Sequence, residues 1–92
     1  MFILVCFDIV DNRTRYRVSK TLKGYGVRVQ KSVFECSDMT EHKFLKMVSK
    51  VEELIDHGED TVRYYKLCAA CVKSVELSGV GTEPILQKYA VA

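Results

Sequence analysis

The feature that most constrains the fold is a continuous apolar run at residues 2–7, Phe-Ile-Leu-Val-Cys-Phe, which ends at Asp8. A run of this length, rich in β-branched and aromatic residues and bounded by turn formers, predicts a β-strand buried on both faces. Side chains alternate along a strand. One face therefore carries Phe2, Leu4, Cys6 and Asp8, and the other carries Ile3, Val5, Phe7 and Ile9.

Both faces of this strand are apolar, so both must be covered. The rest of the chain offers only two convincing helical segments, which are enough to cover one side of a sheet. We therefore predict that a second copy of the chain, related by a two-fold axis, covers the other side. An Asp8 near that axis would bring two carboxylates from two chains together.

The charge is distributed unevenly along the chain. Ninety-two residues predict one small domain, and a net charge of +2 does not by itself indicate a nucleic-acid partner. Half of the basic residues nevertheless lie in a block without acids, which contains Arg13, Arg15, Arg17, Lys20, Lys23, Arg28 and Lys31. The acids are concentrated after this block, so the fold is expected to have one positive and one negative side.

The apolar start of the chain does not have the pattern of a signal peptide. No basic residue precedes it, Asp8 interrupts it, and no run approaches the length needed to cross a bilayer. We therefore expect a cytoplasmic protein without a membrane partner. In that compartment the four cysteines are expected as thiols, not as a disulfide framework.

The remaining segments predict an alternation of helices and strands. We expect a helix over about residues 13–23 after the capping pair Asp11-Asn12, then one bent strand or two short paired strands over 27–36. Thr40 is expected to cap a helix over 41–57 that is closed by Gly58. Strands are expected at 61–67 and 72–77, with a turn near 68–71. The tail from about residue 79 to 92 is expected to pair at a sheet edge, either of this sheet or of a partner subunit's sheet.

This order of segments predicts an α+β fold, namely a ferredoxin-like split βαβ sandwich with an extra C-terminal strand. We expect the fold to be homodimeric and to form a single domain over residues 1–92. The helix at 13–23 would turn a basic face outward, formed by Arg13, Arg17, Lys20 and Lys23. Such a face suits nucleic-acid phosphates, or it is simply solvated.

Several side chains have both a chemical and a structural interpretation. Asp8 at a strand end beside arginines suits Mg²⁺, or it forms a salt bridge with Arg13 or caps a turn. Phe34 and Tyr25 could stack on bases, or they belong to the core. Cys68-x-x-Cys71 is half of a zinc site or a redox pair, or it is two small apolar residues.

Residues 7–18, Phe-Asp-Ile-Val-Asp-Asn-Arg-x-Arg-x-Arg-Val, are followed at 22–36 by Leu-Lys-x-Tyr-Gly-x-Arg-Val-Gln-x-Ser-Val-Phe-Glu-Cys. This pattern resembles the CRISPR-associated Cas2 family, and the likeness covers nearly the whole chain. It implies a ferredoxin-like homodimer that joins the CRISPR integrase, Cas1, to capture and insert new spacers. Members are also described as metal-dependent nucleases on single-stranded RNA or double-stranded DNA.

The resemblance also implies roles for single residues. Asp8 would be the catalytic residue and the ligand of one Mg²⁺ shared between the subunits. The basic residues near phosphate would be Arg15, Arg17 and Arg28, and the site would be lined by Phe7, Ser32 and Phe34. Arg13, on the basic face of the helix that carries Arg15 and Arg17, is a further candidate for nucleic-acid binding. Phe7 and Lys31 occupy positions where many members have tyrosine, so a hydroxyl that could order the metal's water is missing.

Two functions follow from these residues. We favour a dimeric adaptor that grips a DNA duplex or RNA through its basic helix faces, because a phosphate-binding surface is clearer in the sequence than an acid–base pair. The alternative is a Mg²⁺-dependent endonuclease that acts through paired Asp8 residues. A small-ligand sensor of the same fold is disfavoured, because no glycine-rich loop is placed to receive a ligand.

Overall fold

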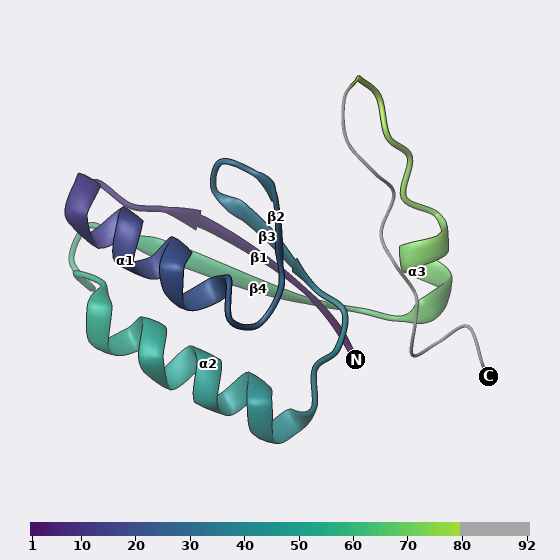
Figure 1. Cartoon of the computed structure of the whole chain (residues 1–92), viewed down its shortest axis with the longest axis horizontal. Coiled ribbons are helices and arrows are strands. Elements are labelled where there is room, and N and C mark those ends of the chain that lie inside the picture. The colour runs from purple at the N-terminus through teal and green to yellow at the C-terminus, as the bar shows by residue number, and fades with distance from the viewer. Residues whose placement is uncertain (80–92) are drawn as a thin grey trace.

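The computed structural model describes residues 1–79, which fold as strand, helix, strand, strand, helix, strand and a final short helix (Figure 1). The elements are β1 (Phe2–Asp8), α1 (Asn12–Leu22), β2 (Val27–Gln30), β3 (Val33–Cys36), α2 (Glu41–Leu54), β4 (Thr61–Leu67) and α3 (Ala69–Lys73). Residues 27–36 therefore form two strands, one of the two arrangements predicted.

The four strands form one antiparallel sheet in the order β2-β3-β1-β4. The central strand β1 pairs on both sides, so that Val5 lies opposite Phe34 of β3 and Tyr64 of β4. Helices α1 and α2 both lie on one face of this sheet (Figure 1). This is the ferredoxin-like split βαβ sandwich, and the predicted fold class is confirmed.

The core lies between the sheet and the two helices. β1 contributes Ile3, Val5 and Phe7, and the helices contribute their apolar stripes, Val18 and Leu22 from α1 and Met47 and Val51 from α2. All of these side chains are buried. Each fully buried aliphatic side chain stabilises the fold by about 1.5–3 kcal/mol relative to an exposed one. The predicted alternation along β1 and both helical stripes are therefore confirmed.

The second face of the sheet is less well covered. On β1, Phe2 is buried, but Leu4 and Cys6 are only half-buried and Asp8 is exposed. On the neighbouring strand β4, Tyr65 is 42% exposed. The described residues thus leave part of an apolar face open to solvent, on the side where the sequence predicts a second subunit. Dimerisation itself stays a prediction.

Helix α2 ends earlier than predicted. Its last residue is Leu54, and Ile55 already has an extended backbone with φ −84° and ψ 158°, so the helix does not reach His57 or Gly58. The cause is a turn built on Asp56, whose carboxylate accepts from the Gly58 N–H at 2.8 Å. The Asp60 carboxylate in turn accepts from the Asp56 N–H at 2.9 Å. Aspartate side chains that bond nearby backbone groups offer an alternative to helix continuation.

The predicted strand over residues 72–77 is wrong. Residues 69–73 form the short helix α3, and residues 75–78 have no regular structure. Two alanines favour a helix here, and the Cys68 sulfur accepts from the Cys71 N–H as an N-cap. The predicted pairing of the C-terminal tail concerns residues 80–92, almost all of the 79–92 segment, and lies outside the described residues. Within residues 1–79, no helix has the length and apolar character needed to cross a membrane.

Gly26, at the entry to β2, cannot accommodate a larger side chain. A Cβ at this position would collide with the backbone oxygen of Glu35, and it would lie 2.6 Å from the Cys36 sulfur and 2.9 Å from the Cys36 Cα. Backbone atoms cannot move aside cheaply. We expect Gly26→Ala to lower the free energy of unfolding by about 1–3 kcal/mol, measured by urea denaturation. Gly24→Ala is the matched control, because its Cβ would approach only the Thr21 carbonyl, at 3.3 Å. An equal loss in both variants would contradict this prediction.

Candidate functional site

A cavity of about 250 Å³ opens at the end of β1, which we call the Asp8 cavity. It is lined by Phe7, Asp8, Ile9, Arg15, Lys31 and Ser32. β1 delivers the first two residues, and the turn between β2 and β3 delivers Ser32, whose carbonyl accepts from the Phe7 N–H at 3.0 Å. The structure therefore brings together four of the predicted site residues, namely Phe7, Asp8, Arg15 and Ser32.

The Asp8 carboxylate is exposed and makes no hydrogen bond or ion pair with any other residue in 1–79. The interpretations of Asp8 as a salt-bridge partner of Arg13 or as a cap are therefore wrong for this part of the chain. The cap of α1 is Asp11, whose carboxylate accepts from the Thr14 N–H at 2.8 Å and from the Thr14 hydroxyl at 3.0 Å. These bonds lower the pKa of Asp11.

Arg15 fastens the segment that follows Asp8 to helix α1. Its guanidinium donates to the Ile9 carbonyl at 3.1 and 3.3 Å, and to the Asn12 side chain at 2.7 Å. These charge-assisted bonds hold the turn between β1 and α1. Arg15 thus places a fixed positive charge in the Asp8 cavity and also stabilises the turn between β1 and α1.

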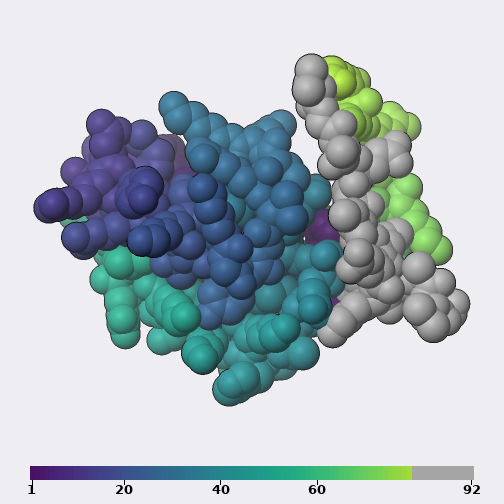
Figure 2. Space-filling view, viewed as in Figure 1, coloured from purple at the N-terminus to yellow at the C-terminus, as the bar shows by residue number. Residues whose placement is uncertain are grey.

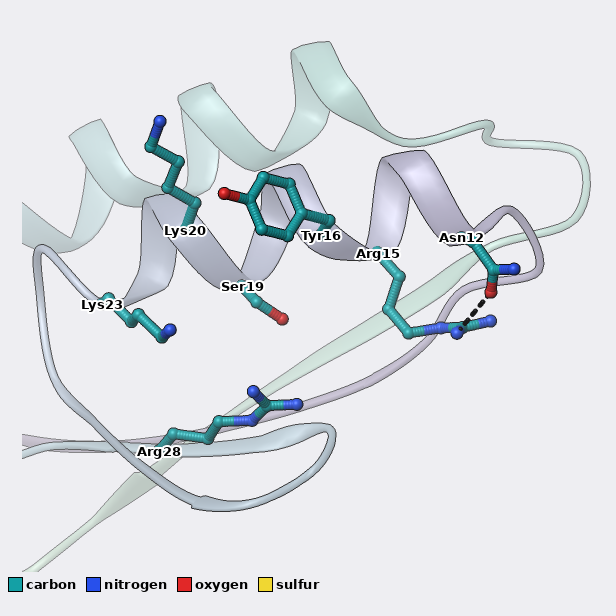
Figure 3. A pocket seen from close by; sticks show the side chains of 7 residues that line it. All are labelled: Asn12, Arg15, Tyr16, Ser19, Lys20, Lys23 and Arg28. Carbon is teal, nitrogen blue, oxygen red and sulfur yellow. Dashed lines mark hydrogen bonds between the residues drawn. The ribbon is translucent and has the colours of Figure 1, made fainter.

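A second cavity, of about 300 Å³, lies between α1 and the β2–β3 hairpin (Figure 3). We call it the basic cavity; it is lined by Asn12, Arg15, Tyr16, Ser19, Lys20, Lys23 and Arg28. Four of these side chains are cationic and none is acidic. Figure 3 shows Arg28 reaching from the hairpin toward Arg15. Because Arg15 lines both cavities, the two lie next to each other.

The hairpin explains how Arg28 reaches this place. Arg28 pairs with the buried Phe34 across the β2–β3 ladder, so it shares the face of the sheet that α1 covers. Its guanidinium donates to the Lys31 carbonyl at 2.8 and 3.2 Å, which holds the turn. The sequence predicts a basic face that includes Lys20 and Lys23, but it does not predict that Arg28 lies beside them. The alternation of side chains along the strand could have indicated which face Arg28 lies on, but only if the register of the β2–β3 hairpin were known.

Other predicted residues lie elsewhere. Arg13 and Arg17 are exposed and line neither cavity. Phe34 does not line the Asp8 cavity, because it is fully buried and stacks behind Phe7 with 6.2 Å between ring centroids. Tyr25 packs against the core, with the Lys50 ammonium 5.4 Å from its ring centroid. The core interpretation is thus correct for both aromatic residues.

The residues of one chain do not fit a magnesium site by themselves. The Asp8 cavity holds a single carboxylate together with two cationic side chains, Arg15 and Lys31. No group of three or more His, Cys, Asp or Glu residues suitable for a metal occurs among residues 1–79. Mg²⁺ takes one or two carboxylates plus water and phosphate oxygens. A second Asp8, from another subunit, is needed to make a better ligand set.

Comparisons with known proteins agree on one family. The profile of the family described as "CRISPR associated protein Cas2" matches residues 1–75. The chain is 40% identical, over 85 residues, to CRISPR-associated endoribonuclease Cas2 1 of Chloroflexus aurantiacus, covering 91% of this chain and 90% of the relative. It is similar to the crystal structure of Streptococcus pyogenes Cas2 at pH 6.5, with TM-score 0.78, 32% identity and coverage of 86% and 100%. A chain of a partial Cas6-RT-Cas1–Cas2 complex matches with TM-score 0.71, 33% identity and coverage of 82% and 81%.

Proposed function

This chain belongs to the Cas2 family of CRISPR-associated proteins, and on that basis we propose that it is a dimeric nucleic-acid-binding adaptor in spacer acquisition. Its partner in this role is the integrase Cas1. A similar chain is part of a complex named for both Cas1 and Cas2, which supports the partnership. The observation that carries the nucleic-acid role is the basic cavity, with four cationic side chains and no acid.

The chemistry of the basic cavity suits a phosphate backbone. Lysines and arginines that neutralise phosphates release counterions, which supplies affinity without reading the sequence. Arg15 and Arg28 use several donors on backbone carbonyls, so they are fixed charges. The side chains of Lys20 and Lys23 make no hydrogen bond or ion pair within residues 1–79, and their ammonium groups are available to a ligand. The cavity thus combines fixed charges with mobile ones.

A homodimer would double this grip. The open face of the sheet presents half-buried Leu4 and Cys6 beside exposed Tyr65, and a second copy packed there would bury this apolar surface. Each subunit would then bring its own basic cavity to the same duplex. Two linked contacts with one ligand bind far more tightly than either contact alone.

A second candidate function is a Mg²⁺-dependent endonuclease that cuts single-stranded RNA or double-stranded DNA. It is supported by the exposed Asp8 carboxylate, free of partners in residues 1–79 and sharing a cavity with Ser32. It is also supported by a relative whose name is endoribonuclease. This function requires the Asp8 of a second subunit. We favour the adaptor, because one chain supplies the complete basic cavity but only half of a metal site.

The substitution Asp8→Asn separates the two functions. For an adaptor, the variant binds a DNA duplex in EDTA slightly more tightly than wild type, by no more than about twofold, because one negative charge is removed. Neither cleaves RNA or DNA in Mg²⁺. Fluorescence anisotropy at several salt concentrations measures the binding, and denaturing gels measure cleavage.

The matched control is Glu59→Gln, which removes an exposed acid outside the Asp8 cavity. If wild type and the control cleave nucleic acid and Asp8→Asn does not, the protein is a nuclease and the adaptor proposal is overturned. Duplex binding by wild type that does not weaken as salt rises would overturn the phosphate grip itself.

A further inference from the structure

Two cysteines that the proposed function does not use meet at the start of α3. The sulfurs of Cys68 and Cys71 lie 3.3 Å apart, and both residues are exposed. Residues three apart in a strand would face opposite ways, but the helical turn of α3 places them on the same side. Figure 2 shows this part of the chain in green at the end of the molecule opposite α1, in purple.

We propose that Cys68 and Cys71 form a thiol–disulfide exchange site, which takes a small disulfide of the glutathione class and becomes an intramolecular disulfide. Two sulfurs 3.3 Å apart must approach by only about 1.3 Å to reach the bonded distance of about 2.05 Å. Both are accessible to a small disulfide from solvent. The site thus has the proximity and the access that exchange requires.

The two thiols are not equivalent. The Cys71 N–H lies 3.4 Å from the Cys68 sulfur, and hydrogen bonds from the backbone and thiol of Cys71 lower the pKa of Cys68. The bond with Cys68, and the charge of its thiolate, raise the pKa of Cys71. Because the thiolate is the nucleophile, Cys68 is the attacking residue and Cys71 the resolving residue.

The exchange takes place in two balanced steps. The Cys68 thiolate attacks one sulfur of glutathione disulfide, so the S–S bond breaks, a Cys68–glutathione mixed disulfide forms, and one glutathione thiolate leaves. Cys71 then gives its proton to water, and its sulfur attacks the Cys68 sulfur, which releases the second glutathione thiolate. The protein loses two electrons and two protons, and glutathione disulfide is reduced to two glutathione molecules.

The other cysteines are poorly placed to compete. Cys36 is buried in the core, and burial raises the pKa of its thiol to about 11. Cys6 is half-buried in the central strand β1. Exchange should therefore be confined to the pair at α3. The Cys68–Cys71 disulfide would link the residue after β4 covalently to the first turn of α3, a helix whose Val72 is buried. It would therefore restrict the conformation of the chain that follows the sheet.

The test uses the full chain, reduced and then equilibrated in buffers with graded ratios of glutathione to glutathione disulfide. Samples are quenched in acid, alkylated and analysed by mass spectrometry. Wild type is expected to lose two hydrogens and to yield linked Cys68 and Cys71, and the control Cys6→Ser is expected to do the same. Cys71→Ser should stop at a mixed disulfide on Cys68, and Cys68→Ser should lose the intramolecular product completely.

Four free thiols in wild type across the whole series would overturn the proposal. It would also be overturned if Cys68→Ser still formed an intramolecular disulfide to the same extent as wild type. Glutathione attached mainly to Cys6 would also overturn it. Binding of phenylarsine oxide to reduced wild type provides a measurement that needs no variant, because the arsenic bridges two neighbouring thiols. Stoichiometric binding, with Cys68 and Cys71 protected from alkylation, is expected; alkylation of both in its presence would contradict the dithiol.

Discussion

Phe34→Ala is expected to lower the free energy of unfolding by about 3–5 kcal/mol. The ring of Phe34 is fully buried and stacks on Phe7, on the β3 strand that pairs with Val5 of β1. Its removal takes apolar area out of the core and leaves a cavity between sheet and helices. Since a small domain is stable by only about 5–15 kcal/mol, much of the variant would be unfolded at moderate temperature. Urea denaturation followed by circular dichroism measures the decrease.

Phe34→Leu separates a core role from a site role. Leucine keeps most of the buried volume, so we expect a decrease of about 1 kcal/mol and a folded protein. If Phe34 acts only in the core, this variant binds duplex DNA as wild type does. Loss of binding in folded Phe34→Leu would mean instead that the ring contacts the ligand, which is the site-lining role that the family resemblance implies.

The parts of the fold that follow local rules were predictable from the sequence. The apolar run before Asp8 determines the central strand because alternation along it leaves no polar face. Asp11 and Thr40 stand just ahead of periodic segments and both accept the expected capping bonds. The cluster of Asp8, Arg15 and Ser32 could be expected from the family resemblance, but its geometry needs the hairpin turn that carries Ser32 to the end of β1.

The errors arose where side chains compete with regular structure or where distant segments meet. Asp56 and Asp60 end α2 by bonding backbone groups, which helical periodicity does not reveal. The Cys68 sulfur caps α3, although cysteine is not among the usual capping residues. The basic cavity depends on the β2–β3 register, which shifts between Arg28 and Gln30. A one-residue change in register would turn Arg28 to the other face.

The paired substitution Lys20→Glu with Lys23→Glu is expected to weaken duplex binding by at least about 100-fold. Removing one ion pair between an ammonium and a phosphate costs about 1.5 kcal/mol, which is about tenfold, and each new carboxylate adds repulsion. Both lysines are exposed, and their ammonium groups have no partner in residues 1–79, so the fold should not change. The dependence of log K on log salt should become shallower by about one unit for each phosphate that the variant no longer neutralises.

The matched control reverses two lysines on α2, Lys43 and Lys46, which line a different cavity. Their reversal changes the net charge of the chain by the same amount, and among residues 1–79 it disturbs only a weak surface pair between Lys43 and Asp38, at 3.9 Å. If a general positive field holds the duplex, both pairs of substitutions weaken binding equally and the basic cavity has no special role. If the cavity between α1 and the hairpin grips phosphates, the α2 pair keeps most of the wild-type affinity and salt slope. In the proposed dimer the basic cavity would occur twice. The difference between the two paired substitutions should then be larger for a duplex long enough to reach both copies of the basic cavity than for one that reaches a single copy.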